Sequence, residues 1–357
     1  MVLAGDIGVN KSYLGIFKKN PENAKRPNLI AEKQYITQDC SSLEDMVGQF
    51  LAEVKPEDNI YSTCFGLCGT ISGTSPKQSC KLTNLPNWPS IDAESLSKKL
   101  FNGVPVDLIN DLVAFGFGIF QLSENEFIDL NQNASVQSDN DYRNRALIAA
   151  LAGLGEALLS WNQGEKKFFP SPSEGGHVDF APGNKLEIEL LDYLLEKRFE
   201  GHSHVSYERV LSEPGLVNIY EFLRDSGKYG NEPTDFRERL GKNDPAQMIS
   251  QLAKENSLCS KALEVFVSIY GAQAGNLALT FAAWGGIYIG GSLAASLFEE
   301  PQFGSIFMQA FKEKGRFSKK MTSIPVKVVR ESKVGLREAA RRAILKEPRG
   351  ISMFGSS

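Results

Sequence analysis

The chain has 357 residues, 42% of them hydrophobic and 23% charged, and a formal net charge of −4. This composition is typical of a globular protein with a large core, and the length suggests about two domains. No basic stripe indicates nucleic-acid binding, but a phosphate-bearing substrate is not excluded, because backbone amides and a single Lys or Arg can bind phosphate locally. No segment reaches the apolar length of a membrane span, and the N-terminal run is too short for a signal peptide, so we expect a cytoplasmic protein.

The cysteine pattern agrees with that location. Five cysteines occur, an odd number, at scattered spacings. Reduced, mostly buried thiols explain this pattern best. No second Cys or His pair stands at zinc spacing, and a structural zinc site needs four ligands, so we expect no zinc centre. The cysteines are Cys40, Cys64, Cys68, Cys80 and Cys259.

Strands and helices alternate along the first part of the chain. Residues 2–8 form a predicted strand, residues 9–12 a tight turn and residues 13–17 the returning strand. Further strands are predicted at 29–35, 60–67 and 106–109, and helices at 42–54 and 93–100. This alternation predicts an α/β fold.

The second part begins with a polar stretch, residues 124–145, which we interpret as a loop or a mobile insertion. Residues 153–157 begin either a helix or a further hairpin. The other predicted elements are strands at 146–152, 287–289 and 324–329, and helices at 185–197, 207–223, 245–284 and 336–346, with another starting at Ser292. We expect a smaller lobe of residues 1–110 with 331–357, and a larger lobe of residues 111–330.

One predicted strand ends in Asn110-Asp111. A carboxylate at the carboxyl end of a strand in an α/β protein lies where ligands bind. Asp111 is therefore a candidate general base, with Asn110 beside it as an orienting hydrogen-bond group. The alternative is structural, because Asp before a helix is also a good N-cap.

Two other polar clusters suggest binding. Asp6, at the end of the first strand, is suited to holding Mg²⁺ through water while the following turn amides face phosphate; the alternative is an ordinary Asp in a hairpin. In Glu174-Gly175-Gly176-His177, the glycines allow a close approach of backbone to ligand, and the two flanking side chains suit neighbouring hydroxyls of a sugar. One Glu and one His are too few ligands for a metal.

Two glycine-rich turns complete the set. Gly153 and Gly155 follow a predicted strand, which alone is weak evidence of a ligand site. Residues 285–292 hold two glycine pairs around a short strand and resemble a nucleotide shelf. The alternative for this second stretch is a strand followed by a tight turn.

Taken together, these blocks resemble the bacterial-type glucokinase family over nearly the whole chain. The most specific blocks are residues 174–182 and residues 208–212. The chain lacks the cysteine-rich zinc motif of the related ROK sugar kinases. The resemblance implies a two-lobed, ribonuclease-H-like (actin/hexokinase) fold with a central cleft. It also implies ATP-dependent phosphorylation of glucose at the 6-hydroxyl, the first step of glycolysis, with ATP and Mg²⁺ as cofactors and a homodimer as a frequent assembly.

The resemblance also implies roles for individual residues. Asp111 is the base, and the other sugar hydroxyls are bound by Asn110, Glu174, His177 and Glu208. Asp6 is expected to hold Mg²⁺ through water. From the residues themselves, we expect Lys11 and Ser12 of the first hairpin to reach phosphate. The full set expected to bind the cofactor is Asp6, Gly8, Asn10, Lys11, Ser12, Gly153, Gly290 and Gly291.

The phosphate side departs from the family pattern. The usual hairpin sequence is Asp-x-Gly-Gly-Thr-Asn; here Val9 replaces the second Gly and Asn10 replaces the Thr. The β-branched Val9 adds bulk and disfavours positive φ. The usual Gly-Thr-Gly turn here contains Ala152. Each hydroxyl donor lost from the phosphate site is expected to cost about 1–3 kcal/mol of interaction with the phosphate. Two alternatives to an active glucokinase follow: a catalytically weak or inactive sugar-binding sensor or regulator, and a kinase with a changed donor or hexose.

Overall fold

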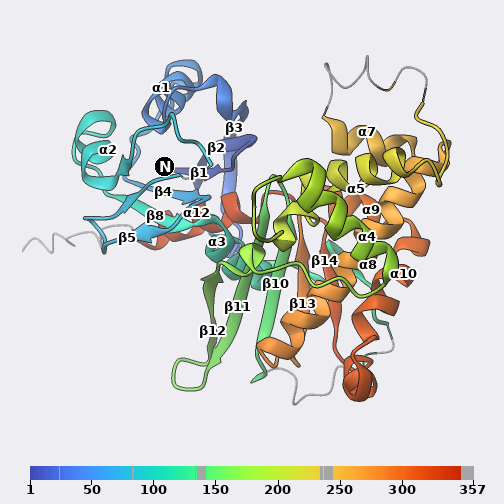
Figure 1. Cartoon of the computed structure of the whole chain (residues 1–357). Helices are drawn as coiled ribbons and strands as arrows, with labels where there is room; N and C mark the ends of the chain where they lie inside the picture. Colours follow the sequence, from blue (N-terminus) through green and yellow to red (C-terminus); the bar gives the residue numbers. More distant parts are fainter. Residues whose placement is uncertain are drawn as a thin grey trace, which may run out of the picture. The chain divides into compact units, whose positions relative to one another are not determined.

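The computed structural model describes residues 1–346 except 24, 83, 133, 135–141, 234–235 and 237–243. The chain forms two compact units, the first comprising Met1–Leu122 with the segment from Lys333 onward, the second Ser123–Ser332 (Figure 1). The break after Leu122 differs from the boundary expected after Asn110. The reason is that α3 (Asp111–Gly118) packs with α12 (Val334–Leu345) in one apolar cluster of the first unit, which includes Ala114 and Leu336.

The main sheet of the first unit has the order β3-β2-β1-β4-β8. The three strands β1, β2 and β3 pair antiparallel, whereas β4 and β8 continue parallel to β1. A small second sheet contains β5 (Ile71–Ser72), β6 (Ser79–Cys80) and β7 (Ile91–Asp92). The main strands are β1 (Val2–Ile7), β2 (Lys11–Lys18), β3 (Asn28–Ile36), β4 (Ser62–Leu67) and β8 (Val106–Asn110).

Helices cover both faces of this sheet, because alternate residues of β1 point to opposite sides. Leu3 and Ile7 pack in the cluster that holds the apolar faces of α1 (Leu43–Val54) and α2 (Ala93–Leu100). Val2 and Ala4 pack in the cluster of α3 and α12. Asp6 continues the second set, so its carboxylate lies on the α3 and α12 face.

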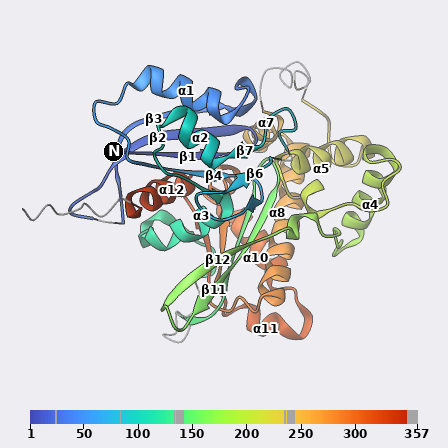
Figure 2. The same ribbon diagram turned by 90° about the vertical axis from the view of Figure 1, so that its left-hand side faces the viewer.

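The second unit repeats this plan and adds one strand. Its sheet has the order β12-β11-β10-β13-β14-β9, and its first five strands pair in the same senses as those of the first unit. The added strand β9 pairs antiparallel with β14. Figure 2 shows β11 and β12 in green. The strands are β9 (Phe127–Asp129), β10 (Arg145–Ala150), β11 (Leu154–Asn162), β12 (Lys167–Ser173), β13 (Gly286–Gly290) and β14 (Val326–Val329).

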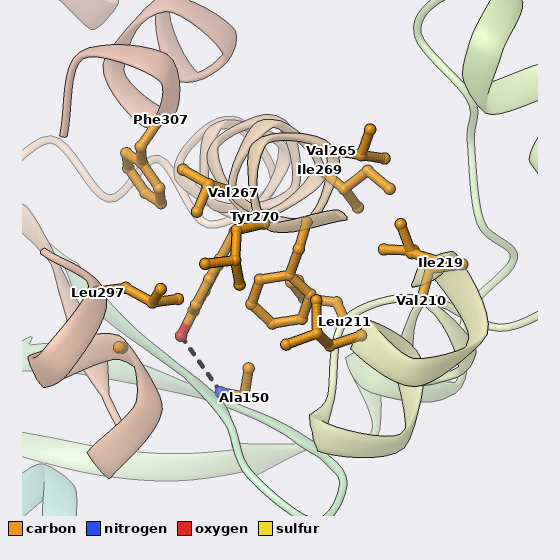
Figure 3. Packing of buried hydrophobic residues seen from close by; sticks show 14 of the residues in the cluster. Ala150, Val210, Leu211, Ile219, Val265, Val267, Ile269, Tyr270, Leu297 and Phe307 are labelled. Atoms are coloured by element: carbon orange, nitrogen blue, oxygen red, sulfur yellow. Dashed lines mark hydrogen bonds between the residues drawn. The ribbon is translucent and has the colours of Figure 1, made fainter. Parts of the chain in front are cut away.

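Helix α8 (Ser257–Thr280) runs through the core of the second unit, and α5, α7 and α10 pack against it. Figure 3 shows part of this packing around Tyr270, whose hydroxyl accepts the Ala150 N–H at 3.2 Å. The end of β10 is thereby fixed to α8. Among the residues that the structure describes, the other α-helices of this unit are α4 (Lys185–Tyr193), continued by a π-helical turn (Leu194–Arg198), α5 (Glu213–Ser226), α7 (Pro245–Leu252), α9 (Ser292–Leu297), α10 (Pro301–Lys312) and α11 (Ser318–Met321).

Several local predictions need correction. The polar stretch 124–145 begins with a 3₁₀ turn and strand β9, while its residues 133 and 135–141 lie outside the described part. Residues 153–157 open β11, so the hairpin alternative is confirmed. The mostly helical stretch expected at 245–284 contains two helices, α7 and α8, because the Asn256 side chain accepts the Cys259 N–H at 3.0 Å and starts α8. The helix expected from residue 207 begins at Glu213, after a cap by Ser212.

The five cysteines are unpaired; four are buried and Cys68 is partly exposed. The buried thiols agree with the sequence-based expectation. In the described part of the chain, no helix has the length and apolar character that crossing a membrane requires.

Candidate functional site

Two carboxylates of the first unit lie beside the same strand. Asp6 is near the end of β1, and Asp111 is the first residue of α3, directly after β8. A Cβ on Gly66 of β4 would lie 3.8 Å from Asp6 Oδ1 and 3.7 Å from Asp111 Cα, so this glycine separates the two acidic residues. Burial raises the pKa of Asp6 to about 6. Burial, together with the nearby Asp6 charge, raises the pKa of Asp111 to about 7. Asp111 can therefore gain or lose a proton near neutral pH.

The helix cap at this point is Asn110. Its Oδ1 accepts the Val113 N–H at 3.1 Å, and its Nδ2 donates to the Gly69 carbonyl at 3.2 Å. Asp111 Oδ1 instead accepts the N–H of the adjacent Leu112 at 2.8 Å. The helix cap that was the alternative role of Asp111 is thus provided by Asn110. Asn110 retains a second amide N–H and a second lone pair for a ligand.

In the β1–β2 turn, Val9 does not adopt the left-handed backbone conformation. Gly8 N–H donates to the Lys11 carbonyl at 3.2 Å, and a Cβ on Gly8 would lie 2.7 Å from that oxygen. Val9 is partly buried against the apolar cluster of α1 and α2, and it is not among the residues with positive φ. The expected backbone conflict at Val9 is therefore absent, because Val9 does not adopt a positive φ.

The Ser12 hydroxyl, expected among the cofactor ligands, is engaged inside the same hairpin. Ser12 is fully buried, and its Oγ lies 2.7 Å from Thr37 Oγ1. Thr37 in turn donates to the Gly8 carbonyl at 2.8 Å. The prediction that this hydroxyl reaches phosphate needs correction for that reason. The side chains of Asn10 and Lys11 are exposed.

The start of α12 comes close to Asp6. A Cβ on Gly335 would lie 2.8 Å from Asp6 Oδ2, so only a glycine lets the helix approach the carboxylate this closely. No role was expected for Gly335 from the sequence. The contact joins residues that are more than 300 positions apart, and no local pattern indicates it.

In the second unit, the two segments carrying the predicted sugar ligands run side by side. The Tyr207 N–H donates to Val178 O at 2.9 Å, and the Phe180 N–H donates to Val205 O at 2.8 Å. Glu174 and His177 precede this pairing, and Glu208 directly follows Tyr207. His177 Nε2 lies 3.8 Å from Glu174 Oε2, and the two side chains are 61% and 79% exposed. Both are accessible to a ligand.

The beginning of β11 contacts both segments. Glu208 Oε2 accepts the Leu154 N–H at 3.0 Å, and a Cβ on Gly153 would lie 2.5 Å from the same oxygen. A Cβ on Gly176 would lie 2.2 Å from the Leu154 carbonyl oxygen. The structure therefore brings Glu174, His177 and Glu208 together around one strand end.

The glycines predicted to bind the nucleotide lie at the same edge of this sheet. Gly290 pairs with Ala149 of β10, next to the turn that contains Ala152 and Gly153. Gly291 has φ +107°, and a Cβ there would lie 2.9 Å from the Ala150 carbonyl oxygen. A side chain at Gly291 is thus excluded by both conformation and space.

One buried acid was not assigned a role from the sequence. Glu156 of β11 is 2% exposed, and its Oε1 accepts the Gln273 Nε2–H at 2.8 Å. The available signal was a carboxylate in an otherwise apolar strand. Among the described residues, no group of three or more His, Cys, Asp or Glu could hold a metal ion.

Comparison with known proteins gives the family. A family model described as Glucokinase matches residues 3–345. A glucokinase of Nostoc sp. is 36% identical over 353 residues, covering 95% of this chain and 98% of the relative. The structure of a glucokinase from an Antarctic psychrotroph matches with a TM-score of 0.73 at 25% identity, covering 97% of this chain and 99% of that chain. A Balamuthia mandrillaris glucokinase, solved in complex with glucose, matches with a TM-score of 0.76 at 20% identity, covering 96% and 93%.

These matches identify the fold as the actin-like ATPase fold of sugar kinases, as the resemblance implied. They also support a hexose phosphotransferase that uses ATP. The chain belongs to the glucokinase family.

Proposed function

We propose that this chain phosphorylates glucose at the 6-hydroxyl with ATP and that Asp111 is the general base. The observation that carries the proposal is the place of Asp111 directly after β8, across Gly66 from Asp6, where Asn110 caps the helix and burial with the Asp6 charge raises the Asp111 pKa to about 7. A base whose pKa is close to the working pH combines adequate ionisation with adequate proton affinity. Asp111 takes the proton from the 6-hydroxyl as the oxygen attacks the terminal phosphorus of ATP, and the bond to ADP breaks.

Glu174, His177 and Glu208 bind the remaining sugar hydroxyls. Support comes from their convergence on the start of β11 and from the exposure of Glu174 and His177. A carboxylate accepts hydrogen bonds, and a neutral imidazole both donates and accepts, so the set can distinguish hydroxyl positions. Asn110 contributes its remaining amide N–H. Orientation of the acceptor is the main contribution of these groups, because phosphoryl transfer depends on positioning and charge stabilisation.

Mg²⁺ fits the environment of Asp6. Two partly buried carboxylates lie on either side of Gly66, and a nearby cation would offset the burial that raises both pKa values. Mg²⁺ binds one or two carboxylates together with water and phosphate oxygens. We assign Asp6 to the metal through water; when bound, the ion neutralises phosphate charge. The cofactor phosphates are assigned to the turn from Gly8 to Lys11, and the nucleotide to Gly153, Gly290 and Gly291.

The test is a coupled assay for glucose 6-phosphate with and without Mg·ATP, with Asp111→Ala as the control. The wild-type chain is expected to turn over and the variant to lose at least about 100-fold in kcat, the usual contribution of a general base. Calorimetric titration with glucose should show binding by both proteins. Glucose binding without turnover above the Asp111→Ala control would contradict the proposal.

Two further expectations accompany this function. The unpaired thiols favour a reducing compartment and hence the cytoplasm. A homodimer, frequent in the family, stays a prediction, which light scattering of the purified protein would check.

A further inference from the structure

We propose that Glu156 is a positioning residue for the sugar-binding groups. Its carboxylate is held by helix α8, and it fixes the position of the turn formed by residues 174–177, which packs on it. The inference rests on the proposed function, since it concerns how Glu174 and His177 are presented to glucose. Glu156 itself is buried beneath the turn and is not expected to touch the substrate.

The burial of Glu156 requires a compensating partner. Glu156 and Gln273 are 2% and 4% exposed, and the Gln273 amide donates to Glu156 Oε1 at 2.8 Å. Burying a carboxylate is costly, and burial raises the pKa of this group. An apolar residue would avoid that cost in a strand whose neighbours Ala157 and Leu159 are buried. The carboxylate is therefore expected to serve a specific contact.

That contact is with the turn above it. A Cβ on Gly175 would lie only 2.0 Å from Glu156 Oε2 and 3.0 Å from its Cδ. A Cβ on Gly176 would lie 2.2 Å from the Leu154 carbonyl oxygen. The two glycines are thus required by the packing of the turn onto β11, whereas the sequence suggested a close approach to ligand. The Glu156 carboxylate forms the floor beneath Gly175. In the sequence, Gly175 lies between the proposed sugar ligands Glu174 and His177.

Helix α8 connects this floor to the other sugar-binding segment. Its residues Tyr270, Gln273 and Asn276 are spaced by three and share one face of the helix. Gln273 bonds Glu156, and its own Oε1 accepts from Asn276 Nδ2 at 3.1 Å. Asn276 Nδ2 also donates to the Tyr207 hydroxyl at 3.0 Å, next to Glu208.

The same face of α8 is fixed at both ends. Tyr270 accepts the Ala150 N–H at the base of the β10–β11 turn. Lys314 Nζ donates to Asn276 Oδ1 at 2.8 Å and to the Ala272 carbonyl at 2.9 Å. One helix face therefore holds the β10–β11 turn, the floor of the 174–177 turn and the residue before Glu208. The spacing between Glu174, His177 and Glu208 depends on this network, so Glu156 should affect which hydroxyl pattern the site accepts.

The first test compares Glu156→Ala with Glu156→Gln. Glu156→Ala removes the floor and is expected to weaken glucose binding at least about tenfold, the effect of losing one or two hydrogen bonds at the site. It should also lower the preference for glucose over mannose and galactose in kcat/KM. Glu156→Gln keeps the volume and an acceptor oxygen, so its affinity should stay within about threefold of wild type. The KM for ATP should not change in either variant.

The second test is a double-mutant cycle with Gly175→Ala. The added methyl group meets the Glu156 carboxylate, so Gly175→Ala alone should weaken glucose binding at least about tenfold, by displacing the turn. In Gly175→Ala with Glu156→Ala, the space is vacated, and affinity should be no lower than in Glu156→Ala alone. Such non-additivity is the signature of direct contact. If the Glu156→Ala protein folds poorly, Gly175→Ala measured by itself still tests the contact.

Asn131→Ala is the matched control. Asn131 is another buried polar residue of the second unit and donates to the carbonyls of Thr322 and Ile324. Its loss should lower Tm and leave glucose affinity and hexose preference unchanged. The inference is overturned if Glu156→Ala and Gly175→Ala lower Tm but bind glucose as wild type does. A wild-type chain that neither binds nor phosphorylates glucose overturns the proposed function instead, and the inference with it.

Discussion

Gly335 brings the first turn of α12 against the carboxylate of Asp6, with space for no side chain: a Cβ at residue 335 would lie 2.8 Å from Asp6 Oδ2. Asp6 is the residue to which we assign Mg²⁺. The positive end of the helix dipole at this point acts against the burial that raises the pKa of Asp6.

The first prediction concerns this contact. Gly335→Ala should displace Asp6 and lower kcat at saturating glucose and Mg·ATP by at least about tenfold, since small displacements of such groups are costly. Overpacking should also reduce the free energy of unfolding by about 1–3 kcal/mol. Gly48→Ala in α1 is the control, because a Cβ there meets nothing within 4 Å. It should leave kcat unchanged and stabilise the helix by about 0.5–1 kcal/mol. Equal kcat values for the two variants would show that the Asp6–Gly335 contact does not matter for the reaction.

The second prediction concerns the ionisation of Asp111. Because the base must be ionised, kcat/KM for glucose should rise with pH and then level off, with a midpoint at or below the raised Asp111 pKa of about 7, since Mg²⁺ at Asp6 offsets the burial that raises it. A profile measured between pH 5 and 9 with Mg·ATP checks this. A flat profile from pH 5 upward would show that Asp111 is ionised throughout or is not the base.

Stability should change in the opposite direction. The unfolded carboxyl ionises near its ordinary pKa of 3.8, whereas the folded one resists ionisation until about pH 7. The folded state therefore binds more protons in this window and loses stability as pH rises through it. Asp111→Asn removes that loss, so its Tm advantage over wild type should grow from pH 4 to pH 7 and stay constant above. A Tm difference that does not depend on pH would contradict the raised pKa.

The third prediction concerns Val9. Val9 packs against the α1 and α2 cluster and has no positive φ. Val9→Gly should therefore not improve ATP binding. It should cost about 1–2 kcal/mol of stability through lost packing and greater freedom of the unfolded chain. The KM for ATP of Val9→Gly should stay within about twofold of the wild-type value, as expected if the valine side chain does not block phosphate. A several-fold decrease in KM for ATP would show that the valine does obstruct the donor.

Local features were accessible from the sequence, and long-range ones were not. The β1–β2 hairpin and α1 follow from turn residues and periodicity. Strand β12 was missed because it contains Pro170 and Pro172, which ordinarily argue against a strand. The shared strand order of the two units was also invisible, since it arises from pairings between distant segments.

The candidate site shows the same division. Asp111 and the 174–177 block were recognised from their neighbours in the chain. The competing roles of Asn110 and Asp111 were not resolved, because either residue type can cap a helix and only the geometry assigns the cap to Asn110. The bond between Gln273 and Glu156 joins residues 117 positions apart, and a glutamine within a buried helix carries no signal of its partner.

The fourth prediction separates two neighbours in the hairpin. Ser12→Ala removes the bond to Thr37 and should cost about 1 kcal/mol of stability, with KM for ATP unchanged. Lys11→Met removes an exposed cation from the turn assigned to phosphate, and it should raise KM for ATP about tenfold, as for loss of a hydrogen bond to a charged group. Thermal melts and ATP saturation curves of the two variants check the pair. An increase in KM for Ser12→Ala would place its hydroxyl on the phosphate after all.

The fifth prediction concerns the exposed sugar ligands. Glu174→Gln and His177→Ala should each weaken glucose binding about tenfold or more, because the first replaces a charged hydrogen-bond acceptor with a weaker neutral one and the second removes a hydrogen-bonding group. Both side chains are well exposed, so the free energy of unfolding should change by no more than about 0.5 kcal/mol. Glu165→Gln is a matched control: Glu165 is an exposed glutamate between β11 and β12 that pairs with Lys167, and its replacement should affect neither quantity. Calorimetric glucose titrations and thermal melts of all three variants decide the matter. A large loss of Tm with unchanged glucose affinity in Glu174→Gln and His177→Ala would make these residues structural, because hydroxyl ligands on an exposed turn can be removed without disturbing the core beneath it.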